Sequence, residues 1–338
     1  MVIAGPNLTI DRTLTIDELR PGEVLRFERV VVTPGGKGVN VARVARELAW
    51  PAVLVGFVPG HTGVAGAALL RDEGIDLTGV AIAGELRSTA VILERGGRVT
   101  VFNEPGPPLA PGDWERFEAA IDAALDRQGV LGGSAVLACS GSLPPAAPGD
   151  AYARLVGVAH RRGALAVVDV AGAQLAAALG AGADVVTPNL AEAEGLLHGR
   201  ADETVEAGDP RVVRERALAA ARELVARGAA HAVVTAAAAG AAVADGSGAR
   251  WLDAAQVDGV GNPIGAGDAF VGGLAVALER GEDMDRAVVH GMATAAASVE
   301  TETAGVVDPA RVAALGVALR AAPGSAPGAA SDPAPGGA

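Results

Sequence analysis

Residues 134–188 read SAVLACSGSLPPAAPGDAYARLVGVAHRRGALAVVDVAGAQLAAALGAGADVVTP, and this stretch decides the fold. Three short apolar runs, SAVLAC (134–139), LAVVDV (165–170) and ADVVTP (183–188), alternate with amphipathic segments near 150–162 and 173–180. This alternation is typical of βαβ units that build a parallel sheet, whose ligands gather at the carboxyl ends of the strands. The stretch therefore predicts an α/β fold with its site in the loops that follow these strands.

Two earlier segments depart from this pattern. The segment STAVILERGGRVTVFNEPGP (88–107) has two β-branched runs around Gly96-Gly97, which predicts an antiparallel hairpin. The segment 12–36 offers similar short strands around Pro21-Gly22. Together they predict a small sheet that stands off the main one, as a lid over a ligand.

Composition narrows the class of protein. Half of the 338 residues are hydrophobic but 3% are aromatic, which favours a core of Ala, Val and Leu under helices. The net charge of -13 argues against nucleic acid or a membrane surface as a partner. One cysteine, Cys139, excludes a disulfide framework, and neither a spanning segment nor a signal peptide is evident, so we expect a cytoplasmic protein. The Pro, Gly and Ala composition of residues 322–338 predicts a disordered tail.

The segment TPGGKGVNVARVARELA (33–49) has a glycine-rich turn that leads into an amphipathic helix. Free backbone N–H groups before a helix, together with Lys37, could bind an anion or a cluster of sugar hydroxyls. A tight turn with a solvated lysine explains the same residues. The segment is not a Walker A loop, because Gly38 follows the lysine where that motif has Ser or Thr.

The segment NPIGAGDAFVGGL (262–274) places Asp268 in the first turn of an apolar helix. Its favourable interaction with the helix dipole is a sufficient structural reason for an acid there. Alternatively, Gly265, Ala266 and Gly267 present backbone N–H groups to charge that develops in a phosphoryl transfer, and Asp268 takes part in the chemistry.

The segment TPNLAEAEGLL (187–197) has Asn189 before an apolar helix and Glu192 three residues later. This is the spacing of a capping box, which satisfies free helix donors. The same two residues could orient water around Mg²⁺ on a nucleotide, and both roles can coexist.

The order of these motifs is GGKGVN (35–40), GSLP (141–144), NLAE (189–192) and GAGD (265–268). In this order the chain resembles the PfkB-type carbohydrate kinases of the ribokinase superfamily over residues 1–320. GPNLTID (5–11) and the segment 86–107 look like the branch that contains 1-phosphofructokinase and tagatose-6-phosphate kinase. The resemblance implies a ribokinase-like three-layer α/β/α sandwich with a mostly parallel central sheet. It also implies a small β-sheet lid, with strands from about 12–34 and 87–104.

The resemblance also implies roles for individual residues. Asp268 is similar to the general base of the family, and its anion hole would be Gly265, Ala266 and Gly267. The acceptor-binding positions would be Asp11, Gly35, Gly36, Lys37, Asn40, Arg87 and Asn103. The ATP-binding positions would be Asn189, Glu192, Thr235 and Gly240, with Glu192 holding Mg²⁺ through water.

The implied activity is ATP-dependent phosphorylation of a hexose phosphate, first of all fructose 1-phosphate to fructose 1,6-bisphosphate. Tagatose 6-phosphate and fructose 6-phosphate are alternative acceptors, and a homodimer through the lid is the implied assembly. A phosphorylated acceptor needs cations, which Arg87, Lys37 and Arg26 can supply. The chain departs from the family at Thr187 and Ala191, where relatives carry lysine, and at Ala237, where they carry glycine. These departures leave a second hypothesis, a non-catalytic sugar-phosphate sensor.

Overall fold

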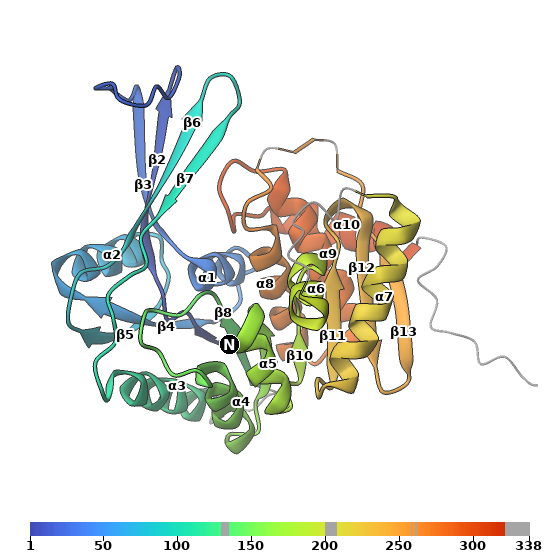
Figure 1. The fold of residues 1–338 in the computed structure, drawn as a ribbon. Helices are drawn as coiled ribbons and strands as arrows, with labels where there is room; N and C mark the ends of the chain where they lie inside the picture. Colours follow the sequence, from blue (N-terminus) through green and yellow to red (C-terminus); the bar gives the residue numbers. More distant parts are fainter. Residues whose placement is uncertain (130–134, 200–207, 258, 261, 322–338) are drawn as a thin grey trace, which may run out of the picture.

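The computed structural model describes residues 1–129, 135–199, 208–257, 259–260 and 262–321, so the tail predicted at 322–338 lies outside the described residues. Within these ranges the main body is built on a nine-stranded sheet of order β13-β12-β11-β10-β9-β8-β1-β4-β5 (Figure 1). Neighbours are parallel from β5 to β11, and β12 and β13 add an antiparallel edge. The mostly parallel sheet predicted from the sequence is confirmed. Its strands are β1 (Val2–Ala4), β4 (Val53–Pro59), β5 (Leu77–Ile82), β8 (Val136–Ser140), β9 (Leu165–Asp169), β10 (Val185–Val186), β11 (His231–Thr235), β12 (Gly240–Asp245) and β13 (Gly248–Asp253).

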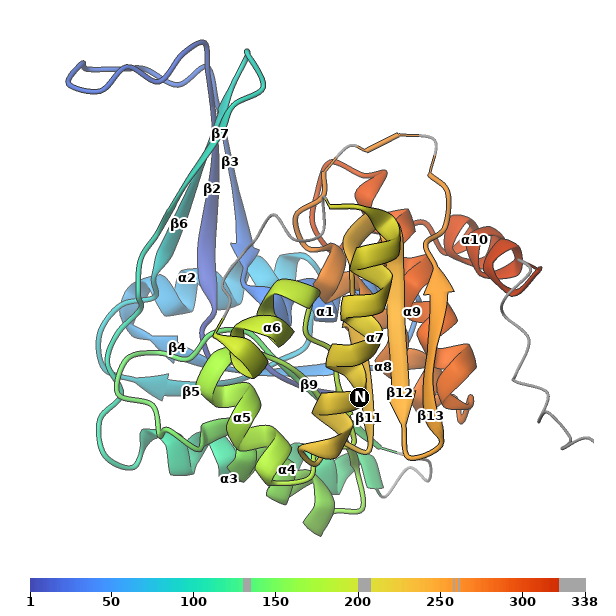
Figure 2. The same ribbon diagram turned by 45° about the vertical axis from the view of Figure 1, so that its right-hand side comes forward.

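Both faces of this sheet are buried under helices (Figures 1 and 2). In β1, Val2 and Ala4 enter one core, while Ile3 enters the other. Such two-sided burial is what a parallel sheet requires and explains its continuous apolar strands. The first core is covered by α3 (Asp113–Gly129), α4 (Ala151–Arg161), α5 (Gly172–Gly180), α6 (Leu190–His198) and α7 (Pro210–Ala226). The second is covered by α1 (Lys37–Glu47), α2 (Gly60–Asp72), α8 (Ala266–Glu279), α9 (Met284–Val299) and α10 (Pro309–Ala321).

A second sheet, the lid, projects from the main body (Figure 2). Its strand order is β3-β2-β6-β7, from β3 (Arg29–Gly35), β2 (Thr9–Ile16), β6 (Ser88–Glu94) and β7 (Val99–Asn103). The pair β6–β7 is the antiparallel hairpin predicted around Gly96-Gly97, while β2 pairs with β6 in parallel. The sequence-based expectation of a small separate sheet is therefore confirmed.

Within the described ranges, no helix combines the length and the apolar character that crossing a membrane would need.

Helix α8 packs closely between α1 and α9 because two adjacent residues of α8 are glycines. A Cβ on Gly272 would lie 2.7 Å from a methyl group of Val44 on α1, and one on Gly273 would lie 2.3 Å from the hydroxyl of Thr294 on α9. Both distances are too short for a real contact, so the helices approach this closely because these positions lack side chains. This packing fixes where the first turn of α8 lies.

We predict that Gly272→Ala destabilises the protein by about 1 to 3 kcal/mol, because the added methyl overpacks the α1–α8 contact. Gly157→Ala is the matched control, since Gly157 lies inside α4 and a Cβ there would meet only the end of Arg161, at 3.5 Å. The control should raise stability by about 0.5 to 1 kcal/mol, the usual gain in helix propensity. Urea denaturation of both variants measures the difference. A stabilised Gly272→Ala variant would contradict the close α1–α8 packing.

Candidate active site

The predicted site residues meet at the carboxyl ends of the central strands. Gly5 follows β1, Ser140 ends β8, Asp169 ends β9 and Thr187 follows β10. The first turns of α1, α6 and α8 bring their polar residues to the same edge of the sheet. Lys37 on α1 is close enough to the carboxylates of Glu192 on α6 and Asp268 on α8 for their charges to raise its pKa. Ligands of open α/β sheets bind at this edge.

Asp268 lies in the first turn of α8, whose N-cap residue is Gly265. Its carboxylate is 5% exposed, and its Oδ2 accepts a hydrogen bond of 2.7 Å from Asn40 Nδ2. Burial raises the pKa of Asp268 to about 7, against lowering by Lys37 and Asn40 and with further raising by Asp169 and Glu192. A carboxyl group with that pKa can accept a proton near neutral pH. Asp268 thus lies where the helix dipole favours an acid, and its carboxylate also bonds a residue of the neighbouring helix α1.

Gly265 gives the backbone beside Asp268 its shape. It is the N-cap of α8 with φ of 84°, in the left-handed region that favours glycine. A Cβ there would also lie 2.8 Å from Ala304. Because the first N–H groups of a helix have no intrahelical partner, that of Gly267 is available to an anion, while that of Ala266 donates a long hydrogen bond of 3.4 Å to the Pro263 carbonyl.

Lys37 begins α1, and its Nζ lies 3.0 Å from Asp169 Oδ2. The attraction of Asp169, and after it that of Asp268 and Glu192, raises the pKa of Lys37. Asp169 is buried and also accepts from Ser140 Oγ at 3.3 Å and Thr187 Oγ1 at 3.2 Å. Sequence reasoning missed Asp169, although an acid at the end of the apolar run LAVVD was the available signal. Thr187, a position where the sequence departs from the family pattern, therefore has a role of its own as a hydrogen-bond donor to Asp169.

Asn189 and Glu192 form the predicted capping box of α6. Asn189 Oδ1 accepts from the Glu192 N–H at 2.8 Å, and Glu192 Oε2 accepts from the Asn189 N–H at 3.0 Å. Glu192 nonetheless acts electrostatically on Lys37 and Asp268. The capping role is confirmed, and the same carboxylate faces the charged centre of the site.

Next to this centre is a pocket with two cationic side chains. Lys37 and Arg87 line it together with Gly36, Asn7 and Ser142. The Arg87 guanidinium is held against the Asn7 carbonyl at 3.0 Å by Nη2, while Asn7 Nδ2 donates to Ser142 Oγ at 3.0 Å. Arg26, the third cation considered, is exposed on the connection between β2 and β3. The pocket thus has positive charge from two elements, α1 and the segment that leads into lid strand β6.

The lid contributes a polar row at its base. Asp11 on β2 is opposite Thr89 on β6, which in turn is opposite Asn103 on β7, so the three share one face. Thr89 Oγ1 donates to Asn103 Oδ1 at 3.1 Å. Asp11 Oδ1 is buried without a hydrogen-bond partner in the described part of the chain, and burial raises the pKa of Asp11. A Cβ on Gly35 would overlap the Asp11 carboxylate at 1.9 Å, so this glycine makes room for the acid.

The two remaining predicted positions lie on the β11–β12 side of the site. Thr235 pairs with Asn189 in an isolated parallel bridge, which brings it next to α6. Gly240 has φ of 135°, and a Cβ there would lie 2.2 Å from the carbonyl oxygen of Leu252. Its glycine is therefore required by the backbone, and its contact with nucleotide stays a prediction.

Comparisons with known proteins agree with this geometry. Residues 6–311 match the family described as pfkB family carbohydrate kinase. The chain is 26% identical to the 1-phosphofructokinase of Haemophilus influenzae over 302 residues, covering 89% of this chain and 91% of that protein. It is 30% identical over 299 residues to ATP-dependent 6-phosphofructokinase isozyme 2 of Mycobacterium tuberculosis, covering 87% and 82%.

The fold is also that of a solved relative. The crystal structure of phosphofructokinase-2 from Escherichia coli in complex with fructose-6-phosphate superposes with a TM-score of 0.79 at 26% identity, covering 94% of this chain and 98% of that one. The three-layer ribokinase-like architecture expected from the motifs is confirmed. The chain belongs to the pfkB family of carbohydrate kinases and is a phosphotransferase.

Proposed function

We propose that the protein transfers the γ-phosphoryl group of ATP to a hexose phosphate, with fructose 1-phosphate as the leading acceptor and fructose 1,6-bisphosphate as product. The observation that carries the proposal is Asp268, a buried carboxylate in the first turn of α8 that accepts a hydrogen bond from Asn40 and has a pKa of about 7. The relative named 1-phosphofructokinase supports this acceptor. The relative named 6-phosphofructokinase keeps fructose 6-phosphate as the second candidate.

Asp268 acts as the general base in this proposal. It removes the proton of the acceptor hydroxyl while that oxygen attacks the γ-phosphorus, and the bond to the ADP oxygen breaks. The N–H groups of Gly265, Ala266 and Gly267 stabilise charge on the phosphoryl oxygens. A non-catalytic sensor would need neither an intact base nor these N–H groups, and for that reason it has less support.

The charges of the site fit Mg²⁺ with a nucleotide. Among the described residues, three carboxyl groups, those of Asp169, Glu192 and Asp268, act on the single ammonium of Lys37. Asp169 and Glu192 would hold the ion, mostly through its water molecules. The ion would neutralise charge on the phosphates. Thr235, next to Asn189, and Gly240 would lie on the nucleotide side.

The acceptor would lie between the pocket and the lid. Lys37 and Arg87 would bind its existing phosphate, while Asp11 Oδ1, Asn103 and the N–H groups of Gly35 and Gly36 would bind its hydroxyls. A neutral sugar would bring no negative charge to the pocket that Lys37 and Arg87 line. We place this activity in the cytoplasm, in keeping with Cys139 as a buried free thiol.

We also propose a homodimer through the lid. The row Val32, Arg12, Ala90 and Phe102 crosses the sheet on the face opposite Asp11. Val32 is 40% exposed and Phe102 is 55% exposed, although both are large and apolar. A solved form of Escherichia coli phosphofructokinase-2 is tetrameric, which supports assembly in this family.

The acceptor class is tested by ADP release with fructose 1-phosphate, fructose 6-phosphate, tagatose 6-phosphate, fructose and ribose. We expect turnover of a hexose phosphate and a rise of at least about 10-fold in its KM in Arg87→Ala, because a charge-assisted bond to phosphate is lost. Arg95→Ala is the control, since Arg95 lies at the lid tip and pairs with Glu28. Turnover of ribose but of no hexose phosphate, or an unchanged KM in Arg87→Ala, would contradict the assignment.

The base is tested by Asp268→Asn. We expect kcat to fall by about 10² to 10⁴ while sugar-phosphate binding persists, because the amide cannot accept the proton. Asp283→Asn is the matched control, since Asp283 caps α9 through the Arg286 N–H and its kcat should not change. Near-normal turnover in Asp268→Asn would overturn the role of Asp268.

The assembly is tested by sedimentation of the wild type and of Val32→Asp with Phe102→Asp. We expect a dimer that dissociates in the double variant, because charged side chains on the exposed row prevent its burial. Val212→Asp, on an exposed position of α7 that is 48% accessible, should stay dimeric. A monomeric wild type, or a double variant that stays dimeric, would contradict the lid interface.

A further inference from the structure

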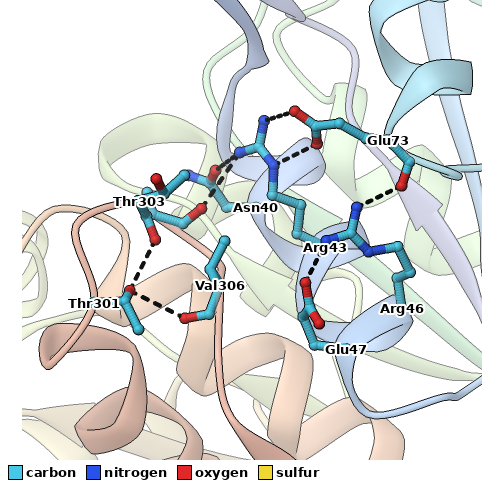
Figure 3. Close-up of polar contacts among 9 residues, drawn as sticks. Asn40, Arg43, Arg46, Glu47, Glu73, Thr301, Thr303 and Val306 are labelled. Atoms are coloured by element: carbon cyan, nitrogen blue, oxygen red, sulfur yellow. Dashed lines mark hydrogen bonds and ion pairs between the residues drawn. The ribbon is translucent and has the colours of Figure 1, made fainter.

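Arg43 on α1 is a buried arginine that the proposed mechanism does not use. It is 4% exposed, and each of its five N–H donors has an acceptor. Figure 3 shows its contacts with Glu73 and Asn40. Nε and Nη2 bind the two oxygens of Glu73 at 2.6 and 3.0 Å, in a bidentate pair. Nη1 donates to Asn40 Oδ1 at 3.0 Å and to the Ala304 carbonyl at 3.3 Å, and Nη2 donates to the Pro34 carbonyl.

The contact with Asn40 determines which way the Asn40 amide points. Arg43 carries only donors, so it must face the amide oxygen. The amide nitrogen is thereby left to donate to Asp268 Oδ2, at 2.7 Å. A reversed amide would place its oxygen against the Asp268 carboxylate and its NH₂ group against the guanidinium, and both contacts would be repulsive.

The acceptors of Arg43 come from four separate segments. Pro34 is at the base of lid strand β3, Glu73 follows α2, Asn40 is on α1 and Ala304 is in the loop between α9 and α10. Thr301 lies in that loop, and its Oγ1 is within hydrogen-bond distance of the carbonyls of Ser298 at 2.8 Å, Thr303 at 3.0 Å and Val306 at 3.2 Å. Figure 3 shows the contacts with Thr303 and Val306. Arg43 is therefore a junction between the base of the lid and the acid in the first turn of α8.

Arg46 lies one turn further along α1 and is the natural comparison. It donates to the Glu73 carbonyl and to Glu47, so it also joins α1 to the end of α2 (Figure 3). These hydrogen bonds of Arg46 go to Glu73 and Glu47 and not to Asn40. A role restricted to holding these helices together would be shared by the two arginines, whereas an effect transmitted through Asn40 belongs to Arg43.

We propose that Arg43 is a positioning residue for the phosphoryl transfer, which fixes the Asn40 amide so that it donates to Asp268. This inference rests on the proposed role of Asp268 as the base. Lysine cannot replace this arginine, because one ammonium cannot reach Glu73, Asn40, Ala304 and Pro34 together.

The first test compares the steady-state kinetics of Arg43→Met, Arg43→Lys and Arg46→Met. We expect kcat to fall about 10- to 100-fold in both Arg43 variants, with the KM of each substrate within about threefold, because the base is misplaced while the binding groups remain. Arg43→Lys keeps a cation beside Glu73, so it preserves the fold if the methionine variant does not. Arg46→Met should keep kcat within about twofold of the wild type.

The second test is a double-mutant cycle with Asn40→Ala, read in kcat. If Arg43 acts through Asn40, adding Arg43→Met to Asn40→Ala lowers kcat by less than about threefold further. Additive losses would show a structural effect and overturn the inference, as would a folded Arg43→Lys variant with wild-type kcat. Asp268→Asn separates the two proposals. If it is inactive while the Arg43 variants are normal, only the positioning role fails; if it turns over normally, the base assignment itself fails.

Discussion

The hydrogen bond from Asn40 to Asp268 joins two helices whose contributing residues are 228 positions apart in the sequence. It forms only because α8 lies directly against α1, at the distance that Gly272 permits. Helix α1 then serves the site with one polar face. Lys37, Asn40 and Arg43 are spaced three residues apart, so they follow one side of the helix, while Val41, Val44 and Ala45 enter the core. Along this face, the Lys37 ammonium contacts Asp169, the Asn40 amide contacts Asp268 and the Arg43 guanidinium contacts Glu73.

The burial of Asp268 lowers the stability of the folded protein near neutral pH. The pKa of Asp268 is raised from 3.8 to about 7 by burial. Between these values the folded protein binds more protons at this group than the unfolded chain does, so this group's contribution to stability falls as pH rises from about 4 to about 7. Lys37 and Asn40 oppose that loss by stabilising the charged form. If neighbouring groups fully offset the effect of burial, the pKa of Asp268 would return to its ordinary value and the group would be a weaker base.

Much of the architecture was predictable because it depends on local patterns. The apolar runs of residues 134–188 indicated the parallel strands, Gly96-Gly97 indicated the lid hairpin, and the spacing of Asn189 and Glu192 indicated the capping box. The contacts that give these residues their chemistry were not predictable in the same way. In the sequence Asp169 is an acid at the end of an apolar run, and the contact with Lys37 depends on how distant elements pack together. Gly240 matched a nucleotide position, but the backbone of β13 also requires glycine there. No pattern in one segment could reveal that Asn40 meets Asp268.

The most direct measurement is the titration of the Asp268 carboxyl group itself, by ¹³C NMR of protein labelled at the aspartate carboxyl carbons. The resonance absent from Asp268→Asn identifies the group. Its burial beside Lys37 and Asn40 predicts a pKa of about 7 in the ligand-free protein. A titration near 3.8, the ordinary value for aspartate, would contradict the account of Asp268 as a buried base.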